Sequence, residues 1–214
     1  ICVNDGSTDE TGQILQRYEN DHQNIRIVDL KENQGLFHAR LAGAERATGD
    51  YIAFMDSDDK VTRHWFGALV RKAEECKADL VFGDMRKNGK VPNDGIDPKI
   101  DCYYNLDPLK GVDLDTDGAG IMQLFMQAHG LCSHYHYIWN KLIRRDLWQR
   151  CVAEYVPFSD RQGHLVMGED IAFSAVLFVF ARHVVNIHHE YYIYCVHDDQ
   201  SVNTNSTKKF RKNI

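Results

Sequence analysis

The chain has 214 residues, with 25 basic and 31 acidic side chains and a formal net charge of −6. This length favours one domain that buries its core without a disulfide or metal staple, and the acidic balance argues against a nucleic-acid partner. The longest apolar stretch, 171–181, is far shorter than the ~20 residues of a membrane span. Six widely spaced cysteines without a C-x-x-C pair are typical of reduced thiols in a cytoplasmic protein.

The first 85 residues alternate between strand-like and helix-like patterns. Strands that alternate with helices predict an α/β fold with a mainly parallel sheet and helices on both faces. The predicted elements are a strand at 1–4, a helix at 10–20, a strand at 25–30, a helix at 34–47, a strand at 51–55, a helix at 62–77 with Thr62 as its N-cap, and a strand at 80–85.

The second part of the chain is less regular. Residues 86–120 are rich in Asn, Asp, Gly and Pro and predict a long loop, and long loops in compact domains are often functional. Further on, the pattern predicts a short helix at 121–129, a helix near 146–151, an apolar helix opened by 168–170 that runs to 181, one or two strands at 184–196, and a basic end at 208–212.

An acidic cluster, Asp56-Ser57-Asp58-Asp59, comes directly after the buried strand at 51–55. Ligands of open α/β sheets bind outside the carboxyl ends of the strands, and Mg²⁺ there takes one or two carboxylates together with substrate phosphates. Other interpretations are an acidic start to the next helix, an EF-hand loop, which lacks its glycine here, and an aspartyl-phosphate phosphatase that uses Asp56 as nucleophile. Asp59 is expected to be a helix-start acid without chemistry of its own.

Three further sites carry candidate side chains. Asp5 follows the first strand and could bind a ligand or fix the turn with Gly6. Glu169 and Asp170 open an apolar helix, where they could be catalytic or could stabilise the helix dipole. His197 follows the last predicted strand and could ligate a metal or lie on the surface.

These pieces, in this order, resemble glycosyltransferase family 2, which is built on the Rossmann-like GT-A fold. The resemblance covers nearly the whole chain and is most specific in the first 60 residues. It is carried by Asn4-Asp5-Gly6-Ser7-Thr8-Asp9, by Asn33-Gln34-Gly35-Leu36 with Ala39-Arg40, by 49–59, by Trp139-Asn140-Lys141-Leu142, by Gly168-Glu169-Asp170, and by Tyr194 with His197 and Ser201.

The resemblance implies a metal-dependent, inverting transferase whose donor is a nucleoside-diphosphate sugar, with a UDP-sugar as the expected form. Asp5 would contact the nucleobase and Asp56 the ribose or an adjacent donor group. Asp58 would ligate Mg²⁺ or Mn²⁺, and His197 would complete that site. Asp170 would be the general base, with Glu169 as the alternative.

The same resemblance divides the expected domain into a nucleotide-sugar-binding half at 1–85 and an acceptor-binding, catalytic half at 86–207, followed by a basic tail at 208–214. The acceptor would be a saccharide or a lipid-linked saccharide in polysaccharide biosynthesis. Aromatic residues of the second half could stack on sugars or simply pack. The expected location is the cytoplasm, with the tail either solvated or in peripheral contact with anionic lipid at the inner face of the membrane.

One departure from the family concerns the start of the chain. The family normally begins with a strand, a turn and a helix before the segment that here opens at Ile1, so we expect the sequence to lack that part. Two other functions stay open on the sequence alone. They are a phosphohydrolase with a strand-D-x-D nucleophile and a non-catalytic module that binds nucleotide sugars.

Overall fold

The computed structural model describes residues 1–88, 112–127, 135–162 and 168–195. His197, Ser201, the basic tail and most of the expected loop at 86–120 lie outside these ranges. In chain order the elements are β1 (Cys2–Asp5), α1 (Thr11–Asp21), β2 (Ile27–Leu30), α2 (Leu36–Glu45), β3 (Tyr51–Ala53), β4 (Lys60–Val61), α3 (Trp65–Cys76), β5 (Leu80–Asn88), β6 (Asp115–Thr116), α5 (Gly118–Gln127), β7 (Lys141–Arg144), α6 (Arg145–Gln162), α7 (Glu169–Phe180) and β8 (Val184–Cys195).

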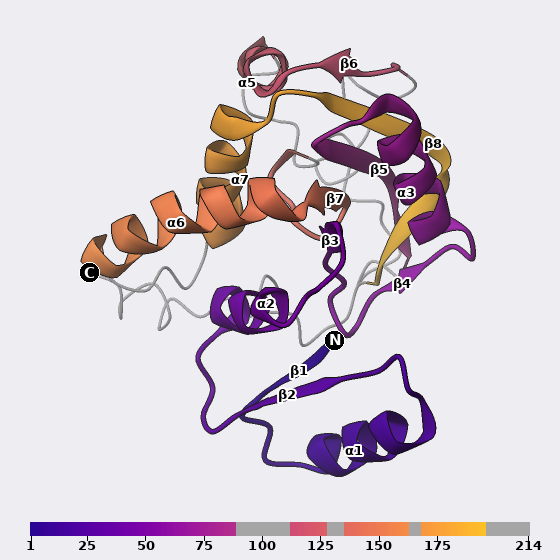
Figure 1. The fold of residues 1–214 in the computed structure, drawn as a ribbon, viewed down its shortest axis with the longest axis vertical. Helices are drawn as coiled ribbons and strands as arrows, with labels where there is room; N and C mark the ends of the chain where they lie inside the picture. The colour runs from indigo at the N-terminus through magenta and orange to yellow at the C-terminus, as the bar shows by residue number, and fades with distance from the viewer. Residues whose placement is uncertain (89–111, 128–134, 163–167, 196–214) are drawn as a thin grey trace, which may run out of the picture.

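The strands form two sheets (Figure 1). β1 and β2 pair in parallel, and the larger sheet has the order β3-β7-β5-β8-β4, with β6 on β8. β7 is antiparallel to both β3 and β5, while β8 is parallel to β5, so β3, β5 and β8 run in one direction. The predicted α/β class is therefore confirmed, with β7 and the short β4 and β6 as antiparallel exceptions.

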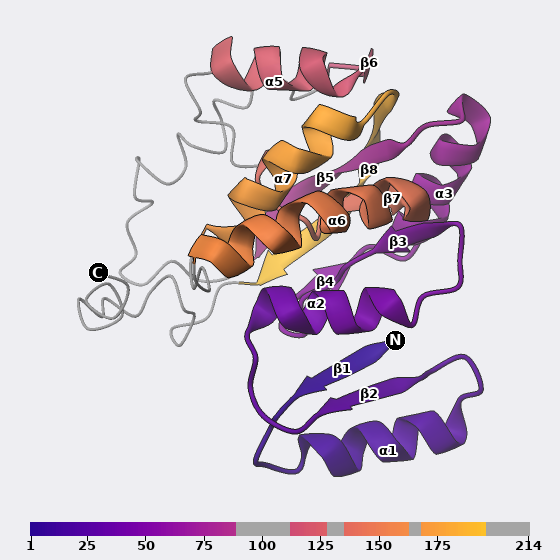
Figure 2. The same ribbon diagram turned by 60° about the vertical axis from the view of Figure 1, so that its left-hand side comes forward.

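Helices cover both faces of the larger sheet, as predicted. Successive residues of a strand point to opposite faces. In β5, Leu80 and Phe82 pack on the side of α2, α6 and α7, whereas Val81 packs on the side of α3 with Trp65 and Leu69. The second view shows α6 and α7 lying together over one face and α3 on the other (Figure 2). Helices therefore enclose the larger sheet on both of its faces.

The β1-α1-β2 unit lies beside α2, below the larger sheet in Figure 2. Gly43 of α2 lies against Val3 of β1, and a Cβ at this glycine would meet Val3 Cγ2 at 3.0 Å. Gly6, with φ 70°, lets the turn after β1 approach the backbone of Glu32 and Asn33. The first contact holds β1 against α2, and the second holds the turn after β1 against the chain that enters α2.

Most predicted elements of the first 85 residues are confirmed within a few residues, but two local interpretations are wrong. Thr62 does not cap α3, which begins three residues later; its hydroxyl donates to Glu190 and accepts the Tyr191 amide at 2.9 Å. Asp59 does not start a helix, because the chain next forms β4 on the edge of β8. Pairing with β8 outweighs the local capping signal at both positions.

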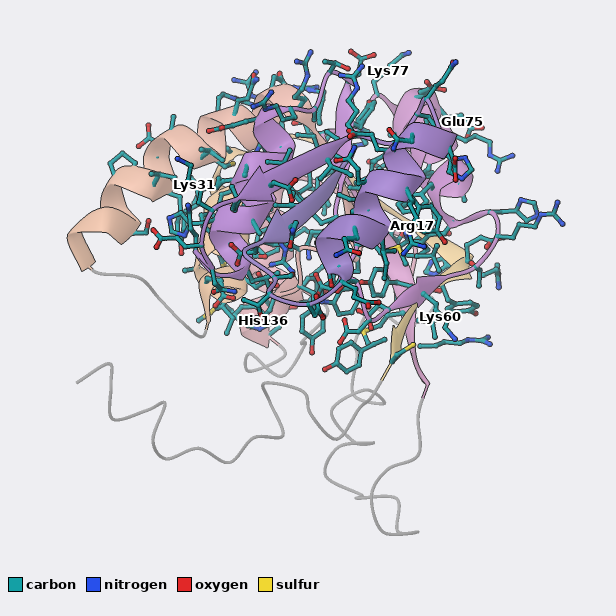
Figure 3. All side chains as sticks on the ribbon, turned by 90° about the horizontal axis from the view of Figure 1, so that it is seen from below. Arg17, Lys31, Lys60, Glu75, Lys77 and His136 are labelled. Atoms are coloured by element: carbon teal, nitrogen blue, oxygen red, sulfur yellow. The ribbon has the colours of Figure 1, made fainter. Side chains whose placement is uncertain are left out.

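Many charged side chains lie on the outside of the described fold, whereas Arg40, Asp59, Asp79 and Lys141 are buried. Figure 3 labels Arg17, Lys31, Lys60, Glu75 and Lys77, and all five are exposed. Among the described helices, none combines the length and apolarity that a bilayer span requires.

Candidate active site

The acidic cluster lies where β3 leaves the sheet, and β8 holds it in place. The Asp56 amide donates to the Tyr192 hydroxyl at 3.0 Å. The Asp59 carboxylate accepts the Cys195 amide at 2.8 Å and is only 6% exposed. Asp58, between them, is exposed. The backbone is therefore anchored at both ends of the cluster, with one carboxylate presented outward.

The two predicted base candidates open α7. Glu169 and Asp170 occupy its first turn, after Gly168 with φ 90° at the N-cap. One turn on, the Ser174 hydroxyl donates to the His136 carbonyl at 2.9 Å, which ties α7 to the chain that enters β7. Acids in a first helical turn are stabilised by the helix dipole, so the position alone explains their presence without proving a chemical role.

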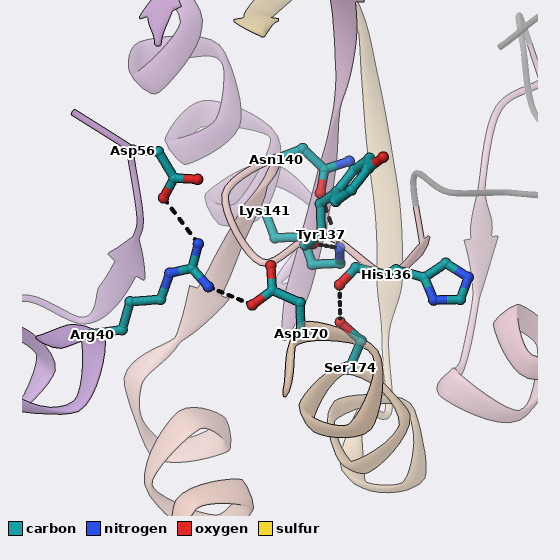
Figure 4. A network of polar contacts seen from close by, with 8 residues as sticks. All are labelled: Arg40, Asp56, His136, Tyr137, Asn140, Lys141, Asp170 and Ser174. Atoms are coloured by element: carbon teal, nitrogen blue, oxygen red, sulfur yellow. Dashed lines mark hydrogen bonds and ion pairs between the residues drawn. The ribbon is translucent and has the colours of Figure 1, made fainter. Parts of the chain in front are cut away.

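Arg40 of α2 joins the two acidic groups. Its Nη2 donates to Asp56 Oδ1 at 2.9 Å, and its Nη1 donates to Asp170 Oδ1 (Figure 4). The Arg40 side chain is 5% exposed, against 24% for Asp56 and 19% for Asp170. Two carboxylates from distant segments are thus held beside one another by a single buried guanidinium.

Burial and ion pairing shift the pKa values of this network in opposite directions. Burial opposes the charge of Arg40, but Asp170 and Asp56 together raise its pKa above the ordinary value. Burial raises the pKa of Asp56, although Arg40 acts to lower it. Burial also raises the pKa of Glu169. Arg40 therefore stays charged, while Asp56 and Glu169 are more easily protonated than exposed carboxylates.

Asp5 has a defined structural role. Its two carboxylate oxygens accept the amides of Gln34 and Gly35 at 2.8 and 2.9 Å, and its carbonyl accepts Asn33 Nδ2 at 3.2 Å. Asp5 therefore closes the loop that leads into α2, the helix that carries Arg40. An ionised carboxylate offers about four acceptor positions, so these bonds leave room for a donor group of a ligand.

Sequence reasoning missed the roles of Arg40, Lys141 and Tyr192. Arg40 had a readable signal, because it is the charged residue on the otherwise small and apolar stripe of its predicted helix. Lys141 is fully buried beside Asp170, and its Nζ donates to Asn140 Oδ1 at 2.9 Å and to the Tyr137 carbonyl (Figure 4). Burial lowers its pKa well below the usual range.

The aromatic residues of the second half that could stack on sugars differ in how far they are exposed. Tyr135 and Trp139 are 1% and 4% exposed, so they pack in the core. Tyr137 is half-buried and stacks on Trp139 with a centroid distance of 4.5 Å. Tyr103 and Tyr104 lie outside the described residues.

A divalent cation would find oxygen ligands at the acidic cluster. Within the described ranges, no group of three or more His, Cys, Asp or Glu side chains has a metal-binding arrangement. Mg²⁺ needs fewer protein ligands than that, because substrate phosphates and water complete its shell. The exposed carboxylate of Asp58 fits this requirement.

Comparisons with known proteins identify the family. The sequence model of glycosyl transferase family 2 matches residues 1–129. The uncharacterized glycosyltransferase EpsJ of Bacillus subtilis is 30% identical over 81% of this chain and 44% of its own length. The cholesterol galactosyltransferase of Borreliella burgdorferi is 26% identical over 90% of this chain and 50% of its own length.

The chain spans about half the length of the curated relatives it matches. The crystal structure of S. aureus TarS 1–349 in complex with UDP-GlcNAc superposes with a TM-score of 0.66 and 19% identity, over 94% of this chain and 50% of that one. This likeness confirms the predicted GT-A glycosyltransferase fold. Together with the match over residues 1–129, it leads to one conclusion: the chain belongs to glycosyl transferase family 2.

Proposed function

We propose that this chain transfers a sugar from a UDP-sugar to an acceptor hydroxyl, with a divalent cation and with inversion at the anomeric carbon. The observation that carries the proposal is the Arg40 bridge, which brings the strand-end carboxylate Asp56 beside the helix-start carboxylate Asp170. The likeness to TarS, whose crystal structures contain UDP-GlcNAc or UDP, supports UDP as the nucleotide. A saccharide or a lipid-linked saccharide is the proposed acceptor.

In this reaction Asp170 accepts the proton of the attacking hydroxyl as the new glycosidic bond forms and the bond to the diphosphate breaks. A positioned base of this kind typically contributes about 10²–10⁴-fold. Attack from the face opposite the leaving group inverts the anomeric carbon. Glu169, whose pKa is raised by burial, is the alternative base on the same helical turn.

The remaining predicted residues bind the donor. Asp5 accepts the imide N–H of the uracil, and Asp56 binds the ribose or an adjacent group. Asp58 holds Mg²⁺ or Mn²⁺, and His197 is proposed as a further ligand. The cation, when bound, neutralises the charge that develops on the departing diphosphate.

Calorimetry with UDP and Mn²⁺ tests the metal assignment without turnover. Asp58→Ala should weaken UDP binding at least about 10-fold, because the loss of even a supporting residue of a metal site has that effect. Asp21→Ala, an exposed acid at the end of α1, is the control and should bind as the wild type does. Unchanged binding by Asp58→Ala would show that the metal assignment is wrong.

Turnover tests the base and separates the alternatives. A panel of UDP-sugars is screened for UDP release, with and without saccharide acceptors, and the anomeric configuration of any product is read by NMR. Asp170→Asn should lower turnover by about 10²–10⁴-fold while UDP affinity is retained. A variant that transfers normally moves the base role to Glu169. A wild type that binds UDP but turns over no sugar would be a non-catalytic binding module.

A further inference from the structure

We propose that Arg40 is a positioning residue, which fixes the base Asp170 at a set distance and angle from the donor-binding carboxylate Asp56. This inference rests on the function proposed above. Its basis is the bridge itself: separate nitrogens of one guanidinium bond the two carboxylates, from α2 to the end of β3 and to the first turn of α7. Arg40 is thus placed between the donor side and the acceptor side of the site.

The chemistry of the bridge requires an arginine. A guanidinium is planar and presents its N–H donors in a rigid fork, whereas a lysine ammonium is a compact point charge. With its side chain 5% exposed, Arg40 is also unlike the solvent-exposed ion pairs whose contribution is small. The guanidinium of Arg40 therefore fixes the orientation of the two carboxylates as well as compensating their charge.

Each partner of the bridge is itself held by packing. Arg40 lies between Phe37 and Ala44 of α2, which are 7% and 8% exposed and belong to the core. Asp170 lies one turn before Ser174, whose hydroxyl bonds the His136 carbonyl. Because the guanidinium and the carboxylate both sit on anchored helices, the bridge holds the base within a narrow range of positions. A displacement of about 1 Å of a catalytic group can cost about 10²-fold in rate.

Arg40→Lys separates positioning from mere charge compensation. The lysine keeps the positive charge but cannot fork to two carboxylates, so kcat for UDP release should fall about 10²-fold with Mn²⁺ and the UDP-sugar that the screen above finds most active. KM should change by less than about 3-fold, since the donor-binding groups remain. Arg46→Lys, the same exchange at the exposed end of α2, should leave both constants unchanged. A kcat within about 3-fold of wild type, or a loss confined to KM, would overturn the proposal.

A thermal double-mutant cycle tests the bridge without activity. Arg40→Met leaves two acids without their cation and should lower the Tm by on the order of 10 °C. In a background with Asp56→Asn and Asp170→Asn, the same exchange should lower the Tm by less than half as much, since the groups in contact are coupled. Equal Tm losses in both backgrounds would refute the bridge. Absence of UDP release from wild type on any UDP-sugar would count against the proposed function, and the cycle would still decide the bridge.

Discussion

Asp59 is predicted to hold the acidic cluster against β8. Its carboxylate accepts the Cys195 amide at 2.8 Å with 6% exposure, so Asp59→Ala leaves a buried N–H unpaired. Such a loss costs about 1–3 kcal/mol. For a chain of this size each kcal/mol shifts the Tm by about 2–4 °C, which gives a fall of about 2–12 °C by calorimetry. Asp59→Asn keeps an acceptor oxygen and should lose less.

Two comparisons make this prediction sharp. Asp58→Ala removes an exposed carboxylate one residue away and should change stability by no more than about 0.5 kcal/mol, although it should weaken UDP binding with Mn²⁺ as proposed above. Burial also raises the pKa of Asp59, so the folded chain keeps this proton to higher pH than the unfolded chain. The stabilising contribution of Asp59 therefore falls as pH rises from about 4. The loss in Asp59→Ala should be larger at pH 4–5 than at pH 7, and equal losses in Asp58→Ala and Asp59→Ala would refute the reasoning.

Three further predictions concern the core. A Cβ at Gly83 would lie 1.8 Å from a tryptophan ring, so Gly83→Ala should lower the free energy of unfolding in urea by about 1–3 kcal/mol, whereas Gly67→Ala, in open space, should not. Burial lowers the pKa of Lys141, so the free energy of unfolding of the wild type should rise as the pH rises toward 10. The stability of Lys141→Met relative to the wild type should therefore fall over that range. A stability difference that does not change with pH would contradict this prediction. Burial raises the pKa of Cys151 to about 12, so iodoacetamide at pH 8 should label the half-buried Cys2 and Cys76 before Cys151, as peptide mass spectrometry would show.

The sequence predicted those parts of the fold whose signals are local. The strand at Tyr51 and the acids after it were readable because an apolar run, a turn before it and carboxylates after it are neighbours in the chain. Thr62 and Asp59 were misread for the opposite reason. Their local pattern suits a helix start, but their polar atoms bond to residues of β8 more than a hundred positions away.

The positions of Asp56 and Asp170 in the fold were predictable from the sequence, but the contacts that join them were not. Asp56 and Asp170 were each singled out at the end of a strand and the start of a helix. Nothing in the spacing of the two acids indicates that Arg40 pairs with both, because that pairing depends on how α2 and α7 pack against β3. The antiparallel β7 was likewise hidden, since strand direction is set by the path of the whole chain.

The bond between the Tyr192 hydroxyl and the Asp56 amide has a practical consequence. Trp139 stacks on Tyr192 with a centroid distance of 4.2 Å, so an indole lies two contacts from the acidic cluster. Movement of the cluster when a nucleotide or a cation arrives would change the surroundings of that indole. Trp65 contacts the same tyrosine ring at a centroid distance of 6.1 Å, so two indoles surround it. The protein thus carries its own fluorescent reporter, which can rank donors before any acceptor is known.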